Sequence, residues 1–301
     1  MDLSRFGAAP PWSVGVEEEL MLVDAETLEP ARDGFSRVFG EATERIKPEL
    51  FESFVEITTT VVETPEEAER ELRALRHEVA ERAAANGLAL LATGSHPTAR
   101  GRVPIVPVDR YRRLKSELGP GLYRQQICGL HVHVSVPDPE TCLRAFEGVV
   151  PRLPRLLAAS ANSPFWEGAE SGWRSIRSQI LLEMPTGGTP PMLRSWDDWE
   201  AATRQDSTRR HWDAWPRPEY GTLEVRVLDQ PTSLRRTAEL AAEVQQLVRE
   251  AADAQGEPFD RDEYAVLRDA AGRQGGGPEA ERQLDLGPEA AVREIAALTL
   301  G

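Results

Sequence analysis

In the stretch VGVEEELMLVD, residues 14–24, three consecutive glutamates interrupt an otherwise apolar run. The pattern predicts a β-strand over residues 13–23. Glutamate is a poor strand former, and carboxylates that lie side by side repel one another. Water, arginine or a metal ion could make this arrangement tolerable, so the partners of Glu17, Glu18 and Glu19 are the first question.

Side chains alternate between the two faces of a strand. Glu17 and Glu19 therefore share one face, while Glu18 points to the opposite, apolar face and needs an arginine partner or a route to solvent. The α-carbons of residues two apart on a strand are roughly 6.5–7 Å apart. Two carboxylates at that spacing can share one Mg²⁺ or hold two adjacent ions, and the cation removes their repulsion.

Other segments divide in the same way into an apolar face and a polar face. Strands are predicted over residues 54–62, 88–93, 127–136, 175–182 and 221–228. Parallel strands that are buried on both faces would be apolar throughout, so the alternation favours a largely antiparallel sheet. Helices would cover its apolar face, which gives an α+β fold. The polar positions that share a face in these segments include Glu56, His131, His133, Arg177, Glu224 and Arg226.

The helical segments fit this architecture. Helices are predicted over residues 66–86, 109–118, 139–160, 232–254, 259–271 and 287–299, with a loop at 185–191 and a flexible break at 274–278. The chain shows no internal repeat at a solenoid or propeller period. We therefore expect a single catalytic domain over residues 1–301, with a polar, partly flexible helical tail from about residue 256.

The composition restricts the class of protein and its partners. The chain has 301 residues, 40% of them hydrophobic and 28% charged, and this is typical of a globular protein. Its formal charge of −15 argues against a nucleic-acid or anionic-membrane partner. Cys128 and Cys142 show neither metal-ligand spacing nor a disulfide framework, so a reducing cytoplasm is expected. No apolar run approaches a membrane span, and a homodimer is the assembly that base rates favour.

The polar face has two interpretations. A sheet face that simply meets water is the common case. This face, however, collects Glu, His, Arg and Gln, the side chains that bind divalent cations and anionic substrates. The interpretations differ in whether the polar strands are neighbours.

Five motifs occur in a recognisable order: VGVEEELMLVD, GLHVHVSVPD, NSPFWEG, SIRSQ and GTLEVRVLD. With these motifs in this order, the chain resembles the carboxylate–amine ligases of the glutamate–cysteine ligase type 2 family over about residues 12–250. The resemblance implies a fold like the catalytic domain of glutamine synthetase, in which a curved antiparallel sheet forms an active-site cradle. It also implies that ATP and Mg²⁺ are used to join the γ-carboxylate of glutamate to the amine of cysteine.

The resemblance also implies roles for particular residues. Arg177 and Arg226 match catalytic arginines, and Arg177 would reach the reacting phosphate or carboxylate. His131 matches a histidine at the metal and phosphate site, so that His131 and Arg177 would contact the nucleotide. Arg110 would contact the substrate carboxylate. The implied metal ligands are Glu17, Glu19, Glu56, His131 and Glu224, with Glu49 as a looser acidic partner.

Such a ligase needs no nucleophilic side chain. ATP activates a carboxylate as an acyl phosphate, and the amine then expels phosphate, while Mg²⁺ and an arginine offset the charge that develops. The sequence contains neither a Gly-x-Ser-x-Gly elbow nor a Gly-rich phosphate loop, in agreement with this chemistry.

The sequence departs from the family pattern at two positions. Trp215 stands where an arginine is expected, and Leu267 stands where an asparagine is expected. These departures leave open a ligase with a different amine acceptor and a non-catalytic relative that binds a nucleotide or amino acid. A phosphotransferase on the same sheet cradle, such as a guanidino kinase relative, is a further alternative.

Overall fold

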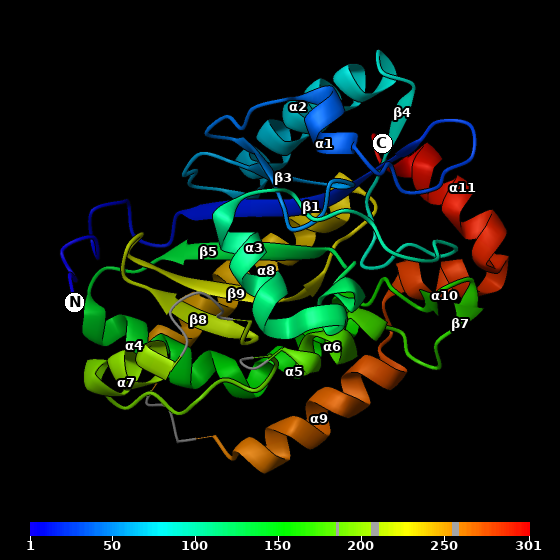
Figure 1. Cartoon of the computed structure of the whole chain (residues 1–301). Helices are drawn as coiled ribbons and strands as arrows, with labels where there is room; N and C mark the ends of the chain where they lie inside the picture. The colour runs from blue at the N-terminus through cyan, green and yellow to red at the C-terminus, as the bar shows by residue number, and fades with distance from the viewer. Residues whose placement is uncertain (185–186, 206–210, 255–258) are drawn as a thin grey trace.

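Six strands follow one another across one antiparallel sheet in the order β2-β3-β1-β5-β9-β8 (Figure 1). A seventh strand, β4, pairs with the second half of β1. The computed structural model describes residues 1–184, 187–205, 211–254 and 259–301. The strands of the sheet are β1 (Val14–Asp24), β2 (Ile46–Pro48), β3 (Phe54–Thr58), β4 (Leu88–Leu91), β5 (Gly129–Ser135), β8 (Ala214–Arg217) and β9 (Thr222–Asp229).

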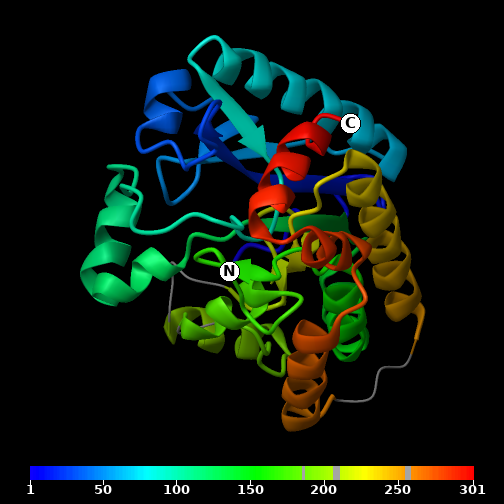
Figure 2. The same ribbon diagram turned by 90° about the vertical axis from the view of Figure 1, so that its right-hand side faces the viewer.

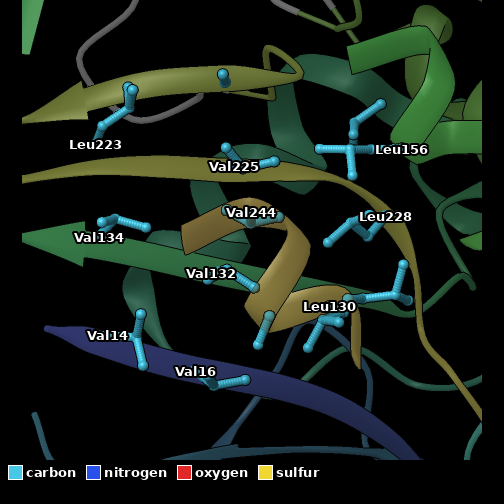
Figure 3. Packing of buried hydrophobic residues seen from close by; sticks show 14 of the residues in the cluster. Val14, Val16, Leu130, Val132, Val134, Leu156, Leu223, Val225, Leu228 and Val244 are labelled. Carbon is cyan, nitrogen blue, oxygen red and sulfur yellow. The ribbon is translucent and has the colours of Figure 1, made fainter. Parts of the chain in front are cut away.

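Helices cover the apolar face of this sheet, as expected. Apolar side chains of β1, β5 and β9, such as Val16, Val132 and Val225, point toward Val244 of one covering helix (Figure 3). A different helix, α3, lies on the opposite side of the sheet (Figure 2). The predicted α+β fold is therefore confirmed. The helices of the apolar face are α2 (Pro65–Ala84), α4 (Pro139–Val149), α5 (Leu153–Ser160) and α8 (Leu234–Asp253), and α3 spans Asp109–Leu118.

Local sequence signals explain where these helices begin. Thr64 caps α2 in a capping box with Glu67, and a proline occupies the first helical position.

The single helix predicted over 139–160 is wrong, because a 3-10 turn at Val150–Arg152 separates α4 from α5. Pro151 and Pro154 lack the backbone N–H that a continuous helix would need at these positions.

The strand predicted over 175–182 is also wrong. This segment forms a short helix, α6 (Ile176–Ile180), followed by a 3-10 turn. Ser175 caps the helix, because its side chain accepts a hydrogen bond from the backbone N–H of Ser178. Alternation over so few residues does not distinguish a strand from a helical turn. The strand predicted over 54–62 is shorter than expected and ends at Thr58.

Several short elements were not predicted. The break at 274–278 separates two C-terminal helices, and the loop at 185–191 has its first two residues outside the described chain. The expected start of the tail, near 256, also lies outside it. In the described chain, no helix is long and apolar enough to cross a membrane. Helices α9 (Arg261–Gln274) and α11 (Pro288–Leu298) lie where helices were predicted, over 259–271 and 287–299. The elements that were not predicted include α1 (Gly34–Val38), β6 (Phe165–Trp166), β7 (Ala169–Glu170), α7 (Trp196–Gln205) and α10 (Pro278–Leu286).

Candidate active site

The polar strands are neighbours, so their polar side chains gather on one face. Strands β3, β1, β5 and β9 are adjacent. Glu19 of β1 lies opposite Glu56 of β3, and Glu17 lies opposite His131 of β5. A cavity of about 300 Å³ lies over this face. This adjacency favours a shared site over separately solvated strands. The predicted site residues that line the cavity are Glu17, Glu19, Glu49, Glu56, Arg110, His131, Arg177, Glu224 and Arg226.

One acidic group is centred on Glu17. His131 Nδ1 lies 3.4 Å from Glu17 Oε2, and His133 Nε2 lies 3.6 Å from Glu17 Oε1. Glu17, His133 and Glu224 each offer a ligand atom, and these atoms lie within 4.8 Å of one another. Burial raises the pKa of Glu17, but His133 and His131 outweigh burial and hold this pKa well below its usual range. The carboxylate is therefore ionised and available to a cation.

A second acidic group contains Glu19, Glu49 and Glu56. The backbone N–H of Gly129 donates to Glu19 Oε2 at 2.6 Å. Burial, together with the charge of Glu49, raises the pKa of Glu19 to about 8. Burial and the charges of Glu17 and Glu49 raise the pKa of Glu56 to about 7. Like charges held this close are unfavourable without a cation, and a bound divalent ion would relieve them.

Two arginines hold Glu224. Arg217 Nη1 lies 2.6 Å from Glu224 Oε2, and Arg226 Nη1 lies 3.1 Å from Oε1. Burial raises the pKa of Glu224, but Arg226 and Arg217 outweigh it and lower the pKa to about 2. Arg217 was not predicted as a site residue, since no strand was expected at β8 and its side chain could not be assigned to a face.

Arg177 reaches the cavity from the short helix α6. Its guanidinium donates to the backbone carbonyls of Val227 at 3.3 Å and Arg226 at 3.1 Å. Asp229 Oδ1 lies 3.8 Å from its Nη1. A Cβ on Gly129 would collide with the Arg177 guanidinium, so a larger residue there would force this arginine to move. The arginine is thus fixed beside the acidic groups although its segment is a helix.

Helix α3 and strand β2 supply the rim of the cavity. The hydroxyl of Tyr111 donates to Glu49 Oε2 at 3.2 Å. Arg110 lies exposed on α3, with its guanidinium carbon 5.2 Å from the centre of the Tyr111 ring. On β2, the ammonium of Lys47 lies 3.3 Å from Glu56 Oε1. Lys47 and Arg110 therefore place positive charge at the rim, above an acidic floor.

The donor set fits Mg²⁺. Carboxylate oxygens are the ligands that this ion prefers. The Nε2 atoms of His131 and His133 are both buried and make no hydrogen bond among the described residues, and each faces a glutamate oxygen, at 3.9 Å from Glu19 Oε1 and 3.6 Å from Glu17 Oε1 respectively. His133 was absent from the predicted metal set, although its alternation with His131 places it on the same face. The residues that could hold cations are Glu17, Glu19, Glu49, Glu56, His131, His133 and Glu224.

Neither departure from the family pattern reaches the cavity. Trp215 is buried between the indole rings of Trp199 and Trp212, at centroid distances of 5.7 and 4.3 Å. Leu267 is exposed on α9, whereas the adjacent Arg268 is buried and pairs with an aspartate. Among the described residues that line the cavity, neither Trp215 nor Leu267 occurs.

The antiparallel sheet, with helices on its apolar face, has the fold of glutamine-synthetase-like ligases. Two solved structures show this fold. A bifunctional glutathione synthetase from Pasteurella multocida matches with a TM-score of 0.63 at 17% identity, covering 96% of this chain and 51% of that one. A glutamate–cysteine ligase from Francisella tularensis in complex with AMP matches with a TM-score of 0.59 at 14% identity, covering 95% and 78%.

Sequence comparison identifies the family. The model of glutamate–cysteine ligase family 2 matches residues 13–276, so the chain belongs to this family. A provisionally named glutamate–cysteine ligase 2-1 of Rubrobacter xylanophilus is 40% identical over 266 residues, covering 83% of this chain and 71% of the relative. Another from Nocardia farcinica is 36% identical over 288 residues, covering 91% and 75%. The chain is therefore a carboxylate–amine ligase of the glutamate–cysteine ligase type.

Proposed function

We propose that this ligase uses ATP and Mg²⁺ to join the γ-carboxylate of glutamate to the amine of cysteine or a related amine. The observation that carries the proposal is the pairing of Glu19 with Glu56 on adjacent strands, inside a cavity that arginines also line. Opposed carboxylates are unfavourable in a sheet unless a cation joins them.

The acidic residues would bind the cations in two groups. Glu17, His131, His133 and Glu224 lie together on β1, β5 and β9. Glu19, Glu49 and Glu56 form the other group. Bound Mg²⁺ supplies positive charge that neutralises the phosphate oxygens of ATP.

The arginines would act on the transferred phosphoryl group and the substrate. Arg177 is held by backbone carbonyls, so its charge is oriented before the reaction and costs no reorganisation. Arg226 is held by Glu224 and has a buried Nε without a hydrogen-bond partner in the described chain. Both side chains line the cavity and suit a catalytic role. Arg110, exposed at the rim, suits a contact with the substrate carboxylate.

The proposed reaction has two steps. An oxygen of the γ-carboxylate attacks the γ-phosphorus of ATP, the bond to the bridging oxygen breaks, and ADP leaves. The amine nitrogen then attacks the acyl carbon, phosphate leaves with the carboxylate oxygen, and the amine loses a proton. No covalent bond to the protein forms in either step.

The amine that this ligase accepts need not be that of cysteine. Trp215 stands where the family pattern expects an arginine, and its side chain packs between Trp199 and Trp212 instead of supplying a charge to the site. A ligase with another amine acceptor is therefore the second candidate. A non-catalytic relative is less well supported, because an unused cluster of buried carboxylates would be costly.

We also propose that residues 1–301 act as one catalytic domain. Two contacts support this. Arg268 of α9 pairs with Asp213 at 2.6 Å, and the carbonyl of Thr299, just after α11, accepts a hydrogen bond from Arg76 at 2.6 Å. Cys128 and Cys142 are both free and buried, which suits the reducing cytoplasm that we expect for the protein.

Measurement of ADP release by the purified protein with Mg²⁺, ATP and glutamate, with and without cysteine, tests this function. We expect cysteine-dependent release with a γ-glutamyl product. Release that depends on glutamate but ignores cysteine would favour another acceptor, to be found with a panel of amines. A phosphorylated amine in place of an amide would favour the phosphotransferase. No release with any pairing would contradict a catalytic function.

A further inference from the structure

Lys47 stands out in the site because the chain contains only two lysines, Lys47 and Lys115. Lys47 lies on β2, at the edge of the sheet, directly opposite Glu56 of β3. Its ammonium lies 3.3 Å from Glu56 Oε1, and its side chain lines the cavity. Lys47 belongs neither to the proposed metal ligands nor to the arginines proposed to act on the phosphoryl group.

Lys47 offsets the charge of Glu56 when no metal is bound. Glu56 lies opposite Glu19 of β1 and lines the same cavity as Glu17 and Glu49, so its carboxylate is surrounded by like charges. Thr58 Oγ1 donates to the same oxygen, Oε1, at 3.4 Å. Lys47 of β2 and Thr58 of β3 therefore both contact Glu56 through the same oxygen, Oε1, and the positive charge comes from Lys47.

A divalent cation at the same carboxylates would compete with this ammonium. Both stabilise the charge of Glu56, and two positive charges a few ångströms apart repel each other. The Lys47 side chain is 42% exposed, compared with 16% for Glu56. Lysine carries its charge on a flexible four-carbon stem, so its ammonium can turn toward the open cavity at small cost.

The released ammonium would face a site with few uncommitted cations. Arg177 is held by backbone carbonyls, and Arg217 and Arg226 are held by Glu224. Lys47 and Arg110 are the remaining lysine and arginine among the described residues that line the cavity. An amino acid with two carboxylates needs such rim cations, because the acidic floor repels it.

We propose that Lys47 is an exchangeable counter-ion: it neutralises Glu56 in the metal-free site, and binding of a divalent cation releases it to contact a carboxylate of the amino-acid substrate. This inference rests on the proposed function. Removal of the Lys47 charge should therefore strengthen the binding of the metal ion and weaken the binding of the amino-acid substrate.

Calorimetry with Mg²⁺ alone, followed by steady-state kinetics, compares wild type with Lys47→Met and Lys115→Met. Without the competing ammonium, Lys47→Met should bind Mg²⁺ more tightly, on the order of tenfold. Its KM for glutamate should rise on the order of tenfold, while kcat changes much less. Lys115, exposed on α3, serves as the matched control and should change neither quantity. Lys47→Arg keeps the charge and should restore wild-type Mg²⁺ affinity. Simple damage to the site would weaken both binding steps.

Nuclear magnetic resonance gives a readout that does not depend on turnover. Lysine labelled with ¹³C at Cε yields two side-chain resonances, which Lys47→Met and Lys115→Met assign. We expect Mg²⁺ to shift the Lys47 resonance and leave that of Lys115 in place, and glutamate to shift the Lys47 resonance again.

The outcomes separate this inference from the function on which it rests. If wild type does not bind Mg²⁺, the proposed function and the role of Lys47 both fail. If wild type binds Mg²⁺ but Lys47→Met binds it no more tightly, the counter-ion role alone fails. An unchanged KM for glutamate in Lys47→Met would overturn the substrate contact.

Discussion

Arg76 of α2 and Glu18 of β1 form a fully buried, two-pronged ion pair behind the proposed metal ligands. Arg76 Nε donates to Glu18 Oε2 at 2.7 Å, and its Nη2 donates to Oε1 at 2.7 Å. Arg76 Nη1 also donates to the carbonyls of Thr232 and Thr299. Glu18, the middle glutamate of the three, thus has an arginine partner, which was one of the two alternatives expected for it beside a route to solvent. This contact ties the central strand to the C-terminal segment.

Substitution of Arg76 should destabilise the fold strongly. Arg76→Met leaves the Glu18 charge buried without its partner, and such losses typically cost about 3–5 kcal/mol. Urea unfolding measures the change. Arg73→Met, which removes a surface pair with Glu69 on the same helix, is the control and should cost about 0.5 kcal/mol or less. Equal effects of the two substitutions would contradict the structural role of the buried pair.

Glycine at 129 should be essential for turnover. Gly129→Ala places a methyl group where the Arg177 guanidinium lies, so this arginine must move. We expect kcat to fall on the order of 100-fold or more, the typical cost of losing one oriented electrostatic contact. Gly15→Ala is the matched control, because a Cβ at that position on the neighbouring strand stays 3.9 Å from His133 Cβ. Similar kcat values for both variants would argue against a catalytic Arg177.

Removing one charge from the acidic floor should abolish metal-dependent activity. Glu19→Gln keeps an oxygen that can accept the Gly129 N–H but removes the negative charge that a cation needs. We expect loss of Mg²⁺-dependent ADP release with little change in urea unfolding. Glu66→Gln, in the first turn of α2, is the control and should keep full activity. Unchanged turnover in Glu19→Gln would remove Glu19 from the metal site.

Mg²⁺ binding should release protons near neutral pH. The pKa of Glu19 is raised to about 8 and that of Glu56 to about 7, so both carboxyls are partly protonated in the metal-free protein at pH 7. A cation binds the ionised form, so its affinity should fall as the pH is lowered from 9 to 6. Calorimetry in two buffers of different ionisation enthalpy counts the protons. A pH-independent affinity with no proton release would contradict these assignments.

His96 should make the fold sensitive to mild acid. Its Nε2–H donates to the carbonyl of Leu28, and its Nδ1 accepts from the N–H groups of Thr98 and Ala99, so the neutral ring is required. Burial lowers its pKa from 6.5 to about 4. The unfolded chain binds this proton first, so stability should be lost as the pH falls from 6.5 to 4, by about 2 kcal/mol at pH 5.

The pH effect is isolated by comparing variants. His96→Asn retains an oxygen that can accept the N–H groups of Thr98 and Ala99 in an Asx turn, but it has no proton to bind in this range. The difference in unfolding free energy between pH 7 and pH 5 should shrink in this variant. His77→Asn, at an exposed position on α2, should leave the difference unchanged. If His96→Asn and wild type lose stability identically as the pH falls, His96 does not cause the pH dependence and the lowered pKa of His96 is contradicted.

Much of the sheet could be predicted from alternation alone. The strands that contain Glu17, His131 and Glu224 are long enough for a period of two to be distinct, and each was placed correctly. Their polar faces then placed Glu17 and Glu19 on one face, whereas Glu49 lies in none of the predicted strands and was assigned from the family resemblance alone. The order of the strands could not be predicted in this way, because alternation assigns a face but not a neighbour.

The errors occurred where local patterns were short or where tertiary contacts decide. The SIRSQ segment alternates, yet Ser175 caps a helix and donates to the buried Asp229. Strands β2 and β8 are too short to give a periodic signal, so the positions of Lys47 and Arg217 in the site were not predicted. An arginine partner for Glu18 was one of two alternatives, beside a route to solvent, and which arginine it is depends on how α2 packs across the sheet.

The fate of the carboxylate oxygen tests the acyl-phosphate reaction at this site directly. Glutamate labelled with ¹⁸O in its γ-carboxylate is incubated with the protein, Mg²⁺, ATP and an accepted amine, and the released phosphate is examined by mass spectrometry. We expect one ¹⁸O atom in each phosphate, since the carboxylate oxygen leaves with phosphorus. Phosphate without ¹⁸O, with the amide still formed, would contradict an acyl-phosphate intermediate and the assignment of this site.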